Sequence, residues 1–566
     1  MWPENRWGTV LCGKKGLIKM DRDETCAAKP PTSCGETFVK QEDGTIIFFT
    51  MIMMIVMLML GGMGIDIMKF ESTRTDLQQT ADRAALASAS ITQRVDSIAV
   101  VNDYFAKAGL GDKLTNVVVT GGAGNALNFK NVRIEARANT NPIFLRLYTN
   151  LGTEQIEARA LSIAEQRISN VEIVLVLDVS GSMGGTKLTN LKTSAMEFVD
   201  TVLLPDTENK VSISIVPYNA QVNIPEILKN QFSFIADNGV PNASCVELPQ
   251  SAFATGPISR TAPHPMMAFA DLVNTASSSH SYDAANMSMN RSSAFCLDQA
   301  QNLIMLPQRN IAALKAKIDS LSARGNTSIT LGMKWGLTLL DPSMKTAYTN
   351  FVAANAIPGQ LAGRPYTYNE TDTLKVIVLM TDGEHVQHPH IADTYKTGTS
   401  PIWRATDGNY SIRHMTRPTW TGTRSFWVPH RSEWREEAWG AGAVQLDWRD
   451  VWPNVRMMWV ARQLYARALG NNDTQRTSIY NTWVSNFRVN WLAANTMDTT
   501  LQQTCTFARN SNVVVYGIAF EAPTNAATQI RNCSSTPGHF FNANGLEIQS
   551  AFRAIASNIS QLRLLQ

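Results

Sequence analysis

The chain has 566 residues, of which 44% are hydrophobic, and this length exceeds what a single hydrophobic core usually organises. We therefore expect a globular protein with several domains. The formal net charge of +3 is too small to indicate a polyanionic partner, which argues against nucleic-acid binding.

Residues 45–65 form the first recognisable element. This stretch of 21 residues contains no charged side chain and is flanked by Glu42 and Asp43 on one side and Asp66 on the other. At 1.5 Å per residue, a helix of this length spans about 30 Å, the thickness of a hydrocarbon core. The sequence predicts a transmembrane helix. A cleaved signal peptide would be shorter and nearer the start of the chain. A buried core helix remains the other alternative.

Charge does not decide the orientation of this helix, because basic residues lie near both of its ends. Cysteines are more informative: three precede the helix (Cys12, Cys26, Cys34) and four follow it (Cys245, Cys296, Cys505, Cys533). An odd set on one side and an even set on the other fits a reducing and an oxidising compartment, respectively. We predict that residues 1–44, which contain no motif, are cytoplasmic and that the large remainder is periplasmic or extracellular. Translation starting at Met20 is an alternative.

The four later cysteines allow three pairings, and the sequence leaves all three open. Pairing of nearest neighbours, Cys245 with Cys296 and Cys505 with Cys533, is the simplest. Closing loops of these lengths would stabilise the chain by about 3 to 4 kcal/mol each in the chain-entropy description. Four free, buried thiols are the alternative.

Residues 66–168 are predicted to form a helix followed by a small β-rich spacer. Over residues 70–91, small apolar side chains recur at helical spacing: Leu77, Ala81, Ala84, Ala85 and Ala89. This stripe suits either a partner helix or packing within the same domain. The segments 116–120, 131–136 and 155–160 then alternate apolar and polar residues, as half-exposed strands do.

From residue 169 onward, strands alternate with helices. A strand at 171–177, a helix at 188–204 and a strand at 211–217 begin the series, and further helices and strands continue it to the end. This order predicts an α/β domain with a doubly wound, mostly parallel sheet over residues 169–566. Two long insertions, at about 219–307 and 384–455, interrupt the series.

Three oxygen-bearing side chains follow the strand 171–177. They are Asp178, Ser180 and Ser182, at a spacing of two residues, and Gly181 allows the loop to tighten around them. Carboxylate and hydroxyl oxygens select hard cations such as magnesium, manganese or calcium. Because serine-rich turns are common, this pattern alone is weak evidence for a metal site.

Two later segments strengthen the metal prediction. The turn 324–328 offers Thr327 before an apolar helical stretch, and a second apolar strand, 374–380, ends next to Asp382. Ligands of open parallel sheets bind outside the carboxyl ends of the strands, so we expect Asp178 and Asp382 to lie at the same edge.

These five residues, in this order, resemble the metal-ion-dependent adhesion site of the von Willebrand factor type A domain. The resemblance implies that Asp178, Ser180, Ser182, Thr327 and Asp382 hold Mg²⁺ (or Mn²⁺ or Ca²⁺), directly or through water. It also implies that the ion takes an aspartate or glutamate carboxylate of a partner as its remaining ligand. A degenerate domain that keeps these residues without the ion is the alternative.

The amino-terminal part resembles TadG-like proteins of the tight-adherence (Flp) pilus machinery. The charge-free helix and residues 77–87 carry this resemblance, together with residues 505–509 and 533–541 before a last amphipathic helix at 546–562. Such proteins have one inner-membrane helix, a spacer and a von Willebrand A domain outside the membrane. One departure is that Phe49, and not glutamate, stands five residues after Gly44, so we do not expect prepilin-type cleavage.

The second insertion contains seven of the 13 tryptophans, interleaved with arginines. Tryptophan and arginine dominate binding hot spots, so Trp403, Trp420, Trp427 and Trp434 are candidates for partner binding. Equally, an insertion without a sheet of its own would need large aromatic residues to build a small core.

His385, His388 and His390 follow Asp382, but Pro389 removes the helical spacing of metalloprotease ligands. We expect solvent-facing histidines here, with a zinc site as a minor alternative. No serine-hydrolase nucleophile motif is recognisable, and we expect no enzyme.

The combined prediction is a membrane-anchored, cation-dependent protein-binding component of pilus assembly or anchoring. Its expected partners are other pilus assembly proteins or pseudopilins and the inner membrane. A cell-surface adhesin that uses the same metal site, and a metal-free structural scaffold, are the alternatives.

Overall fold

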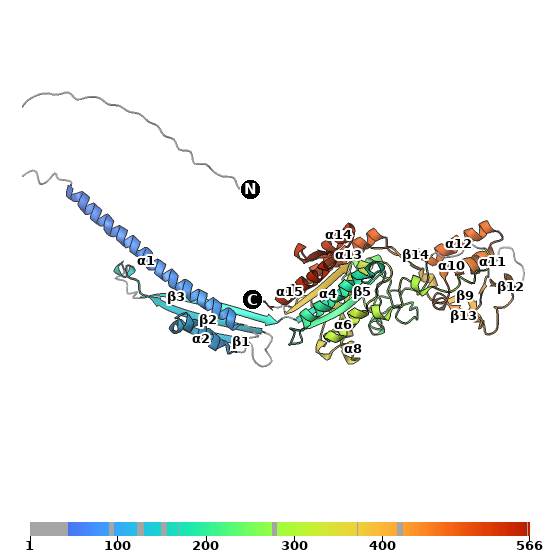
Figure 1. Cartoon of the computed structure of the whole chain (residues 1–566), viewed down its shortest axis with the longest axis horizontal. Coiled ribbons are helices and arrows are strands. Elements are labelled where there is room, and N and C mark those ends of the chain that lie inside the picture. Colours follow the sequence, from blue (N-terminus) through green and yellow to red (C-terminus); the bar gives the residue numbers. More distant parts are fainter. Residues whose placement is uncertain are drawn as a thin grey trace, which may run out of the picture. The chain divides into compact units, whose positions relative to one another are not determined.

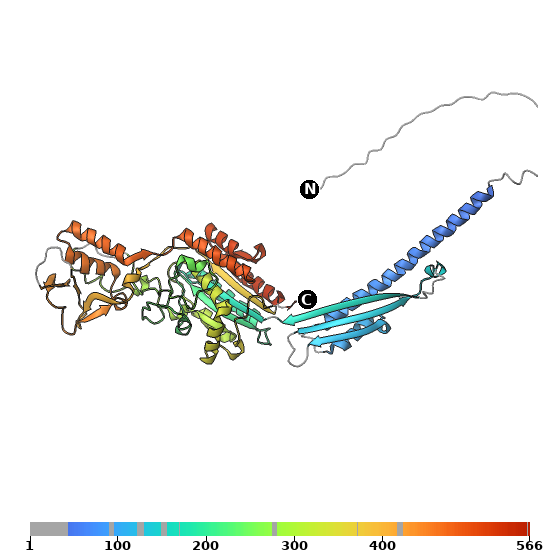
Figure 2. The same cartoon turned by 180° about the vertical axis from the view of Figure 1, so that it is seen from behind.

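The computed structural model describes residues 43–89, 95–121, 129–148, 155–168, 170–273, 280–370, 372–415, 423–562 and 564–565 (Figures 1 and 2). The predicted amino-terminal segment up to residue 42 lies outside these ranges, as does Trp420. The chain divides into two compact units: residues 1–79 with 136–160, and residues 80–135 with 161–566.

A single long helix, α1 (Asp43–Ser88), contains the predicted transmembrane stretch. The side chains of its apolar part are exposed, for example those of Phe48, Met54 and Leu60 at 67%, 63% and 62%. Among the described residues, this is the one helix long and apolar enough to cross a membrane. Exposed apolar side chains along this uncharged stretch of α1 fit a membrane anchor and disagree with a buried core helix.

Asp66 ties the end of the apolar stretch to a loop of the same unit. Its carboxylate accepts hydrogen bonds from the backbone N–H groups of Ile143, Phe144 and Leu145 at 3.0, 2.7 and 2.7 Å. These donors precede or begin the short helix α3 (Leu145–Tyr148), where backbone N–H groups otherwise have no partner. A Cβ built on Gly62 would lie 2.3 Å from the Phe144 ring, so glycine permits the close approach of this loop.

The small apolar stripe of α1 is buried within the chain. Leu77, Ala81, Ala84 and Ala85 are fully buried, and Ala89, just past the helix, is 4% exposed. Of the two roles that the sequence left open for this stripe, the structure favours internal packing.

A four-stranded sheet with the order β1-β2-β3-β17 follows the helix α2 (Ser97–Lys107). Its strands are β1 (Leu114–Gly121), β2 (Phe129–Thr140), β3 (Ile156–Ile168) and β17 (Leu564–Leu565). The three predicted strands lie within β1 and β2 and across the start of β3. In β2, Val132, Ile134, Ala136 and Ala138 are buried at every second position, which is the alternation of a strand with one covered face.

A six-stranded sheet forms the centre of the second unit, with the order β16-β15-β7-β4-β5-β6. Its strands in chain order are β4 (Asn170–Asp178), β5 (Val211–Tyr218), β6 (Met305–Gln308), β7 (Thr373–Thr381), β15 (Val513–Phe520) and β16 (Phe540–Ala543). Neighbouring strands are parallel except for the antiparallel pair of β5 and β6. The α/β prediction is confirmed in this coarse form, with a mixed sheet.

Helices cover both faces of this sheet and build two cores (Figure 1). One core includes α4 (Thr186–Leu203), α6 (Ile311–Ser320) and α15 (Glu547–Leu562). The other includes α7 (Ile329–Leu340), α8 (Lys345–Ala353), α13 (Ala494–Asn510) and α14 (Thr524–Cys533). Successive residues of β4 alternate between the two cores, because side chains of a strand point to opposite faces in turn.

Helix α7 packs so closely on the sheet that all twelve of its residues are buried. A Cβ on Gly332 would lie 2.6 Å from the Tyr218 ring, and one on Gly336 would lie 2.7 Å from Cγ2 of Val176. The two glycines therefore set the depth of the helix against the strands.

In its described residues, the segment between β5 and β6 has little regular structure beyond the short helix α5 (Glu226–Lys229) and single turns of 3-10 helix. The disulfide Cys245–Cys296 links two parts of this segment, with 5.9 Å between the Cα atoms. A second disulfide, Cys505–Cys533, joins α13 to α14. Both are pairs of nearest neighbours.

Residues 389–490, which we call the tryptophan-rich region, leave and rejoin the α/β unit through an antiparallel pair of strands, β8 (Pro389–Ile391) and β14 (Arg488–Asn490). Between them lies an antiparallel sheet with the order β12-β11-β10-β9-β13. Its strands are β9 (Thr399–Arg404), β10 (Tyr410–Arg413), β11 (Phe426–Val428), β12 (Glu433–Arg435) and β13 (Val444–Asp447).

Helical segments complete this region: α9 (Trp448–Val451), α10 (Met457–Trp459), a π-helical turn (Val460–Ala466), α11 (Arg467–Leu469) and α12 (Asp473–Phe487). The alternative of a small aromatic core in this insertion is confirmed, but its premise that the insertion lacks a sheet of its own is wrong, because the core and a sheet occur together. Strands of three to six residues are too short for their alternation to be recognised in the sequence.

Candidate metal-binding site

The five predicted ligands come from three loops at one edge of the six-stranded sheet. Strand β4 ends at Asp178, and the turn Gly181–Met183 that follows carries Ser182. The neighbouring strand β7 ends at Thr381, directly before Asp382. Because β4 and β7 are parallel and in register, with Leu177 opposite Met380, both aspartates emerge at the same edge.

Hydrogen bonds connect four of these residues. The backbone N–H of Ser180 donates to Oδ1 of Asp178 at 2.8 Å, and the Ser180 and Ser182 hydroxyl oxygens are 3.0 Å apart. The Ser182 hydroxyl donates to Oδ1 of Asp382 at 2.7 Å. The four side chains therefore lie within one continuous cluster, although 200 residues separate Ser182 from Asp382.

Thr327 reaches the same cluster from the loop before α7. A Cβ built on Gly383 would lie 3.1 Å from Oγ1 of Thr327 and 3.5 Å from Oγ of Ser182, so both hydroxyls face the same point above Gly383. Backbone bonds hold this loop: the Gly181 N–H donates to Gly325 O at 2.8 Å, and the Val386 N–H donates to Thr327 O at 3.0 Å. We call Asp178, Ser180, Ser182, Thr327 and Asp382 the strand-end site.

The strand-end site is buried except at Ser182. Asp178 is 0% exposed, whereas Ser182 is exposed. Burial, with an added contribution from the negative charge of Asp382, raises the pKa of Asp178 to about 6. A site that holds two carboxylates this close to each other disfavours its own negative charge and would be stabilised by a cation.

Two residues that sequence reasoning missed contact the carboxylates of the strand-end site. Thr381 donates its hydroxyl hydrogen to Oδ2 of Asp178 at 2.7 Å. Lys187, in the first turn of α4, places its ammonium group 2.9 Å from Oδ2 of Asp382 and 3.7 Å from Oε2 of Glu521. The only signal for either residue is its proximity in sequence to a predicted ligand.

The donor set fits a hard divalent cation. Two carboxylates and three hydroxyls are oxygen donors of the kind that Mg²⁺, Mn²⁺ and Ca²⁺ accept. Among the described residues there is no cluster of three or more His, Cys, Asp or Glu side chains suited to a metal. An ion at the strand-end site would therefore depend on its serine and threonine ligands.

The histidines after Asp382 bind three different partners and do not form a zinc site. Nδ1 of His385 lies 2.7 Å from Oδ1 of Asp498, Nε2 of His388 lies 2.8 Å from Nε2 of Gln221, and Nδ1 of His390 bonds Oε2 of Glu247. The expectation of solvent-facing histidines is also wrong. His385 and His388 are only 6% and 1% exposed, because neighbouring segments cover this loop.

The predicted partner-binding tryptophans occupy mixed positions. Trp427 belongs to the aromatic core and is 7% exposed, and its indole N–H donates to Gln463 O at 3.0 Å. Trp434 and Trp403 are half-buried and contact Trp427 and Phe426, respectively. These contacts account for the three side chains as packing residues, while their role in partner binding stays a prediction.

Fold and site together define a protein that combines a long apolar helix with an α/β unit bearing a candidate cation site. Residues 44–90 match the family described as putative Flp pilus-assembly TadE/G-like. The resemblance to TadG-like proteins predicted from the sequence is confirmed by this match. No curated protein matches the chain in sequence.

Similar solved structures include the vWF domain of the type V pili tip protein Mfa5 from Porphyromonas gingivalis. It is 14% identical, with 70% of this chain and 98% of that one covered and a TM-score of 0.30. The adhesive tip pilin GBS104 from Group B Streptococcus agalactiae is 10% identical, with 69% and 100% covered and a TM-score of 0.30. Proximal thread matrix protein 1 from the mussel byssus, with a zinc-occupied MIDAS motif, is 8% identical, with 69% and 46% covered and a TM-score of 0.24.

Proposed function

We propose that this chain is a membrane-anchored, divalent-cation-dependent protein-binding component of Flp (tight-adherence) pilus assembly or anchoring. The observation that carries the proposal is the convergence of two carboxylates and three hydroxyls in the strand-end site. The family match over residues 44–90 supports the pilus context, and α1 fits a single-pass membrane anchor.

We further propose that residues 169–566 are a von Willebrand A-like, doubly wound domain that follows a spacer at residues 66–168. Support comes from the order of the six strands and from the helices on both faces of the sheet. The first insertion spans about 219–307. For the second, predicted at 384–455, the pairing of β8 with β14 supports an extension to Asn490.

In the proposed mechanism, Asp178 and Asp382 supply the negative charge of the site, while Ser180, Ser182 and Thr327 supply neutral oxygens. Neutral hydroxyls leave a divalent charge incompletely compensated, which favours an anionic ligand from outside. When bound, Mg²⁺ (or Mn²⁺ or Ca²⁺) would supply the positive charge that attracts an aspartate or glutamate carboxylate of a partner. The exposed Ser182 marks the side from which that carboxylate approaches.

Partner binding is proposed to bias the last helix through α4. Helix α4 begins beside the site with Lys187, and Glu197 further along it accepts from Gln549 of α15 at 2.6 Å and pairs with Arg553 of α15. A change at the strand-end loops that moves α4 therefore also moves its contacts with α15.

We place the large carboxyl-terminal part outside the cytoplasm, with α1 in the bacterial inner membrane. The two disulfides support an oxidising compartment for it. The proposed partners are other pilus assembly proteins or pseudopilins, and the proposed role is binding and not catalysis.

Calorimetric titration of the purified full chain with MgCl₂ and MnCl₂ tests the proposal. The unmodified chain is expected to release binding heat, and Asp178→Ala is expected to lose it while retaining its circular dichroism spectrum. Asp319→Ala, which removes an exposed carboxylate at the end of α6, serves as the matched control and should bind as the unmodified chain does. Absence of heat in the unmodified chain would overturn the metal-dependent function and favour a structural scaffold.

Chelator treatment tests the pilus role directly. Pilus assembly proteins from solubilised membranes should be retained by the unmodified chain with MgCl₂ and released by EDTA. Antibody labelling of the α/β unit on intact cells would favour the adhesin alternative over an assembly role.

A further inference from the structure

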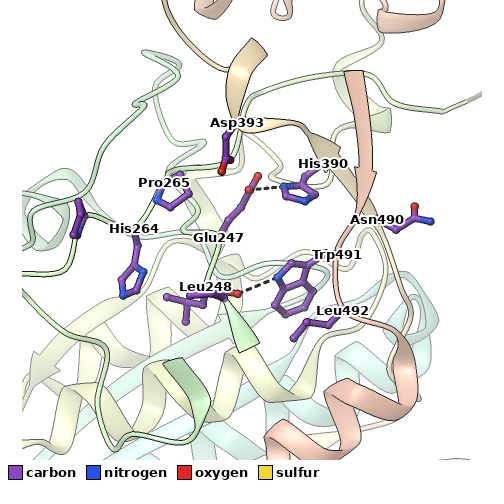
Figure 3. A pocket seen from close by; sticks show the side chains of 11 residues that line it. Glu247, Leu248, His264, Pro265, His390, Asp393, Asn490, Trp491 and Leu492 are labelled. Carbon is purple, nitrogen blue, oxygen red and sulfur yellow. Dashed lines mark hydrogen bonds and ion pairs between the residues drawn. The ribbon is translucent and has the colours of Figure 1, made fainter. Parts of the chain in front are cut away.

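A pocket of about 440 Å³ lies apart from the strand-end site (Figure 3). It forms where the segment between β5 and β6 meets the two strands at the base of the tryptophan-rich region. One wall comes from the segment between β5 and β6 through Glu247, Leu248 and His264, and the other from β8 and β14. Its volume falls within the range of small-ligand pockets, roughly 300–1,000 Å³. None of the five strand-end residues lines it.

The floor of the pocket is apolar, and one hydrogen bond joins its two walls. Trp491 is 8% exposed, and its indole N–H donates to the Leu248 carbonyl oxygen at 3.1 Å across the pocket base (Figure 3). Leu492 and three prolines extend this surface. Such walls suit the aliphatic part of a long side chain better than a small, fully hydrated ion.

The polar end of the pocket is built around a buried carboxylate. The Glu247 side chain is 5% exposed and lies between Asp393 and His390 (Figure 3). Its Oε2 bonds both His390 and Lys396, whereas its Oε1 accepts no hydrogen bond from any described residue. A buried carboxylate oxygen without a donor is costly, so this atom invites a donor from outside.

The charges around this carboxylate favour a cationic donor. Glu247 and Asp393 share one ammonium group, that of Lys396, which lies 2.7 Å from Oδ1 of Asp393. No lysine or arginine is among the described residues that line the pocket. Burial, with an added contribution from the charge of Lys334, lowers the pKa of His264, so this histidine adds no positive charge at neutral pH.

We propose that this pocket binds a basic side chain of a partner polypeptide. The ammonium or guanidinium group lies on Oε1 of Glu247, and the aliphatic stem packs on Trp491 and Leu248. Arginine fits best, because its planar, weakly hydrated head tolerates burial and its stem matches the apolar floor. The strand-end site and this pocket would thus recognise opposite charges on a partner, a carboxylate and a basic group.

Calorimetry with two capped tripeptides tests the proposal on the full chain. The probes are acetyl-Leu-Arg-Pro-amide and its analogue with norleucine in place of arginine, which has a similar stem and no charge. The arginine peptide is expected to bind about tenfold more tightly, and Glu247→Gln is expected to abolish this difference. Equal affinities of the two peptides for the unmodified chain would overturn the proposal.

A second variant keeps the test valid if Glu247→Gln fails to fold. Asn490 is exposed and lines the pocket, so Asn490→Lys adds a competing charge without removing the Glu247 contacts. It should reduce the arginine preference at least fivefold, whereas Asn495→Lys, the same change at an exposed position outside the pocket, should not. An unaltered preference in Asn490→Lys contradicts the proposal.

The titrations are repeated with EDTA to separate this pocket from the cation site. Arginine-peptide binding that persists with EDTA supports the pocket, even if the metal titration fails. Binding that disappears with EDTA would show that it depends on a bound cation and would overturn the pocket proposal.

Discussion

The strand-end site and the tryptophan-rich region both lie beyond the carboxyl end of β7, yet they use their side chains in opposite ways. The site brings polar groups from three loops to one edge of a sheet, with Ser182 open to solvent. The tryptophan-rich region turns Trp427, Trp448, Trp452 and Trp459 into its own core. Strand register therefore positions the first region, and hydrophobic burial organises the second.

The largest expected effect tests the aromatic core. Trp452 is fully buried, lies 5.2 Å from the Trp448 ring and donates its indole N–H to Tyr395 O at 2.7 Å. Trp452→Ala should lower the free energy of unfolding by about 4 kcal/mol, measured by urea denaturation. Trp403→Ala removes a half-buried tryptophan of the same region and should cost half as much or less. Equal costs would contradict the inward organisation of this region.

The second prediction concerns pH. Burial, with an added contribution from His390, lowers the pKa of His388 to about 4. The unfolded chain binds this proton below about pH 6.5 and the folded chain does not, so stability falls as the pH drops from about 6.5 towards 4. The loss amounts to about 3 kcal/mol. In His388→Gln, the free energy of unfolding measured by urea denaturation should therefore depend less on pH across this range.

The half-buried His430 provides the control for this pH dependence. Burial lowers the pKa of His430 as well, but its ring is less deeply buried. His430→Gln should change the pH dependence less than His388→Gln does. If His430→Gln changed the pH dependence more than His388→Gln, the assignment of the acid sensitivity to His388 would be contradicted.

The third prediction tests how α7 supports the strand-end site. A Cβ on Gly332 meets the Tyr218 ring at 2.6 Å, so Gly332→Ala should destabilise the chain by about 2 kcal/mol. Because α7 begins just after Thr327, cation binding should weaken too, as measured by calorimetry. Gly359→Ala, where a Cβ would meet nothing within 4 Å, is the matched control. Unchanged cation affinity in Gly332→Ala would show that the packing of α7 does not support the strand-end site.

The smallest effect concerns the charge that already faces the site. The Lys187 ammonium group lies 2.9 Å from Oδ2 of Asp382 and competes with any bound cation for this oxygen. Lys187→Met should therefore tighten Mn²⁺ binding roughly tenfold, again measured by calorimetry. Lys192→Met, which removes a half-buried lysine of the same helix whose ammonium group donates to Asp319 O, should leave the affinity unchanged. Weaker Mn²⁺ binding in Lys187→Met would instead show that this lysine helps to hold the site in its binding geometry.

Sequence reasoning succeeded where a local pattern has one structural consequence. Apolar strands that end at Asp178 and next to Asp382 place both carboxylates at one sheet edge, because parallel neighbours share their direction. It failed for His385 and His388, which no local pattern marks as buried. Their partners, Asp498 and Gln221, are 113 and 167 residues away.

The amino-acid sequence by itself determined the apolar helix, the α/β strand order and the five polar positions after the strands. These features depend on periodicity and on residues close together in the chain. Only the tertiary structure decided that Lys187 faces Asp382, that four described tryptophans of the tryptophan-rich region are buried in its core, and that Glu247 meets His390 beside a pocket. Such contacts join distant segments, and their geometry depends on how whole elements pack, which no short stretch of sequence encodes.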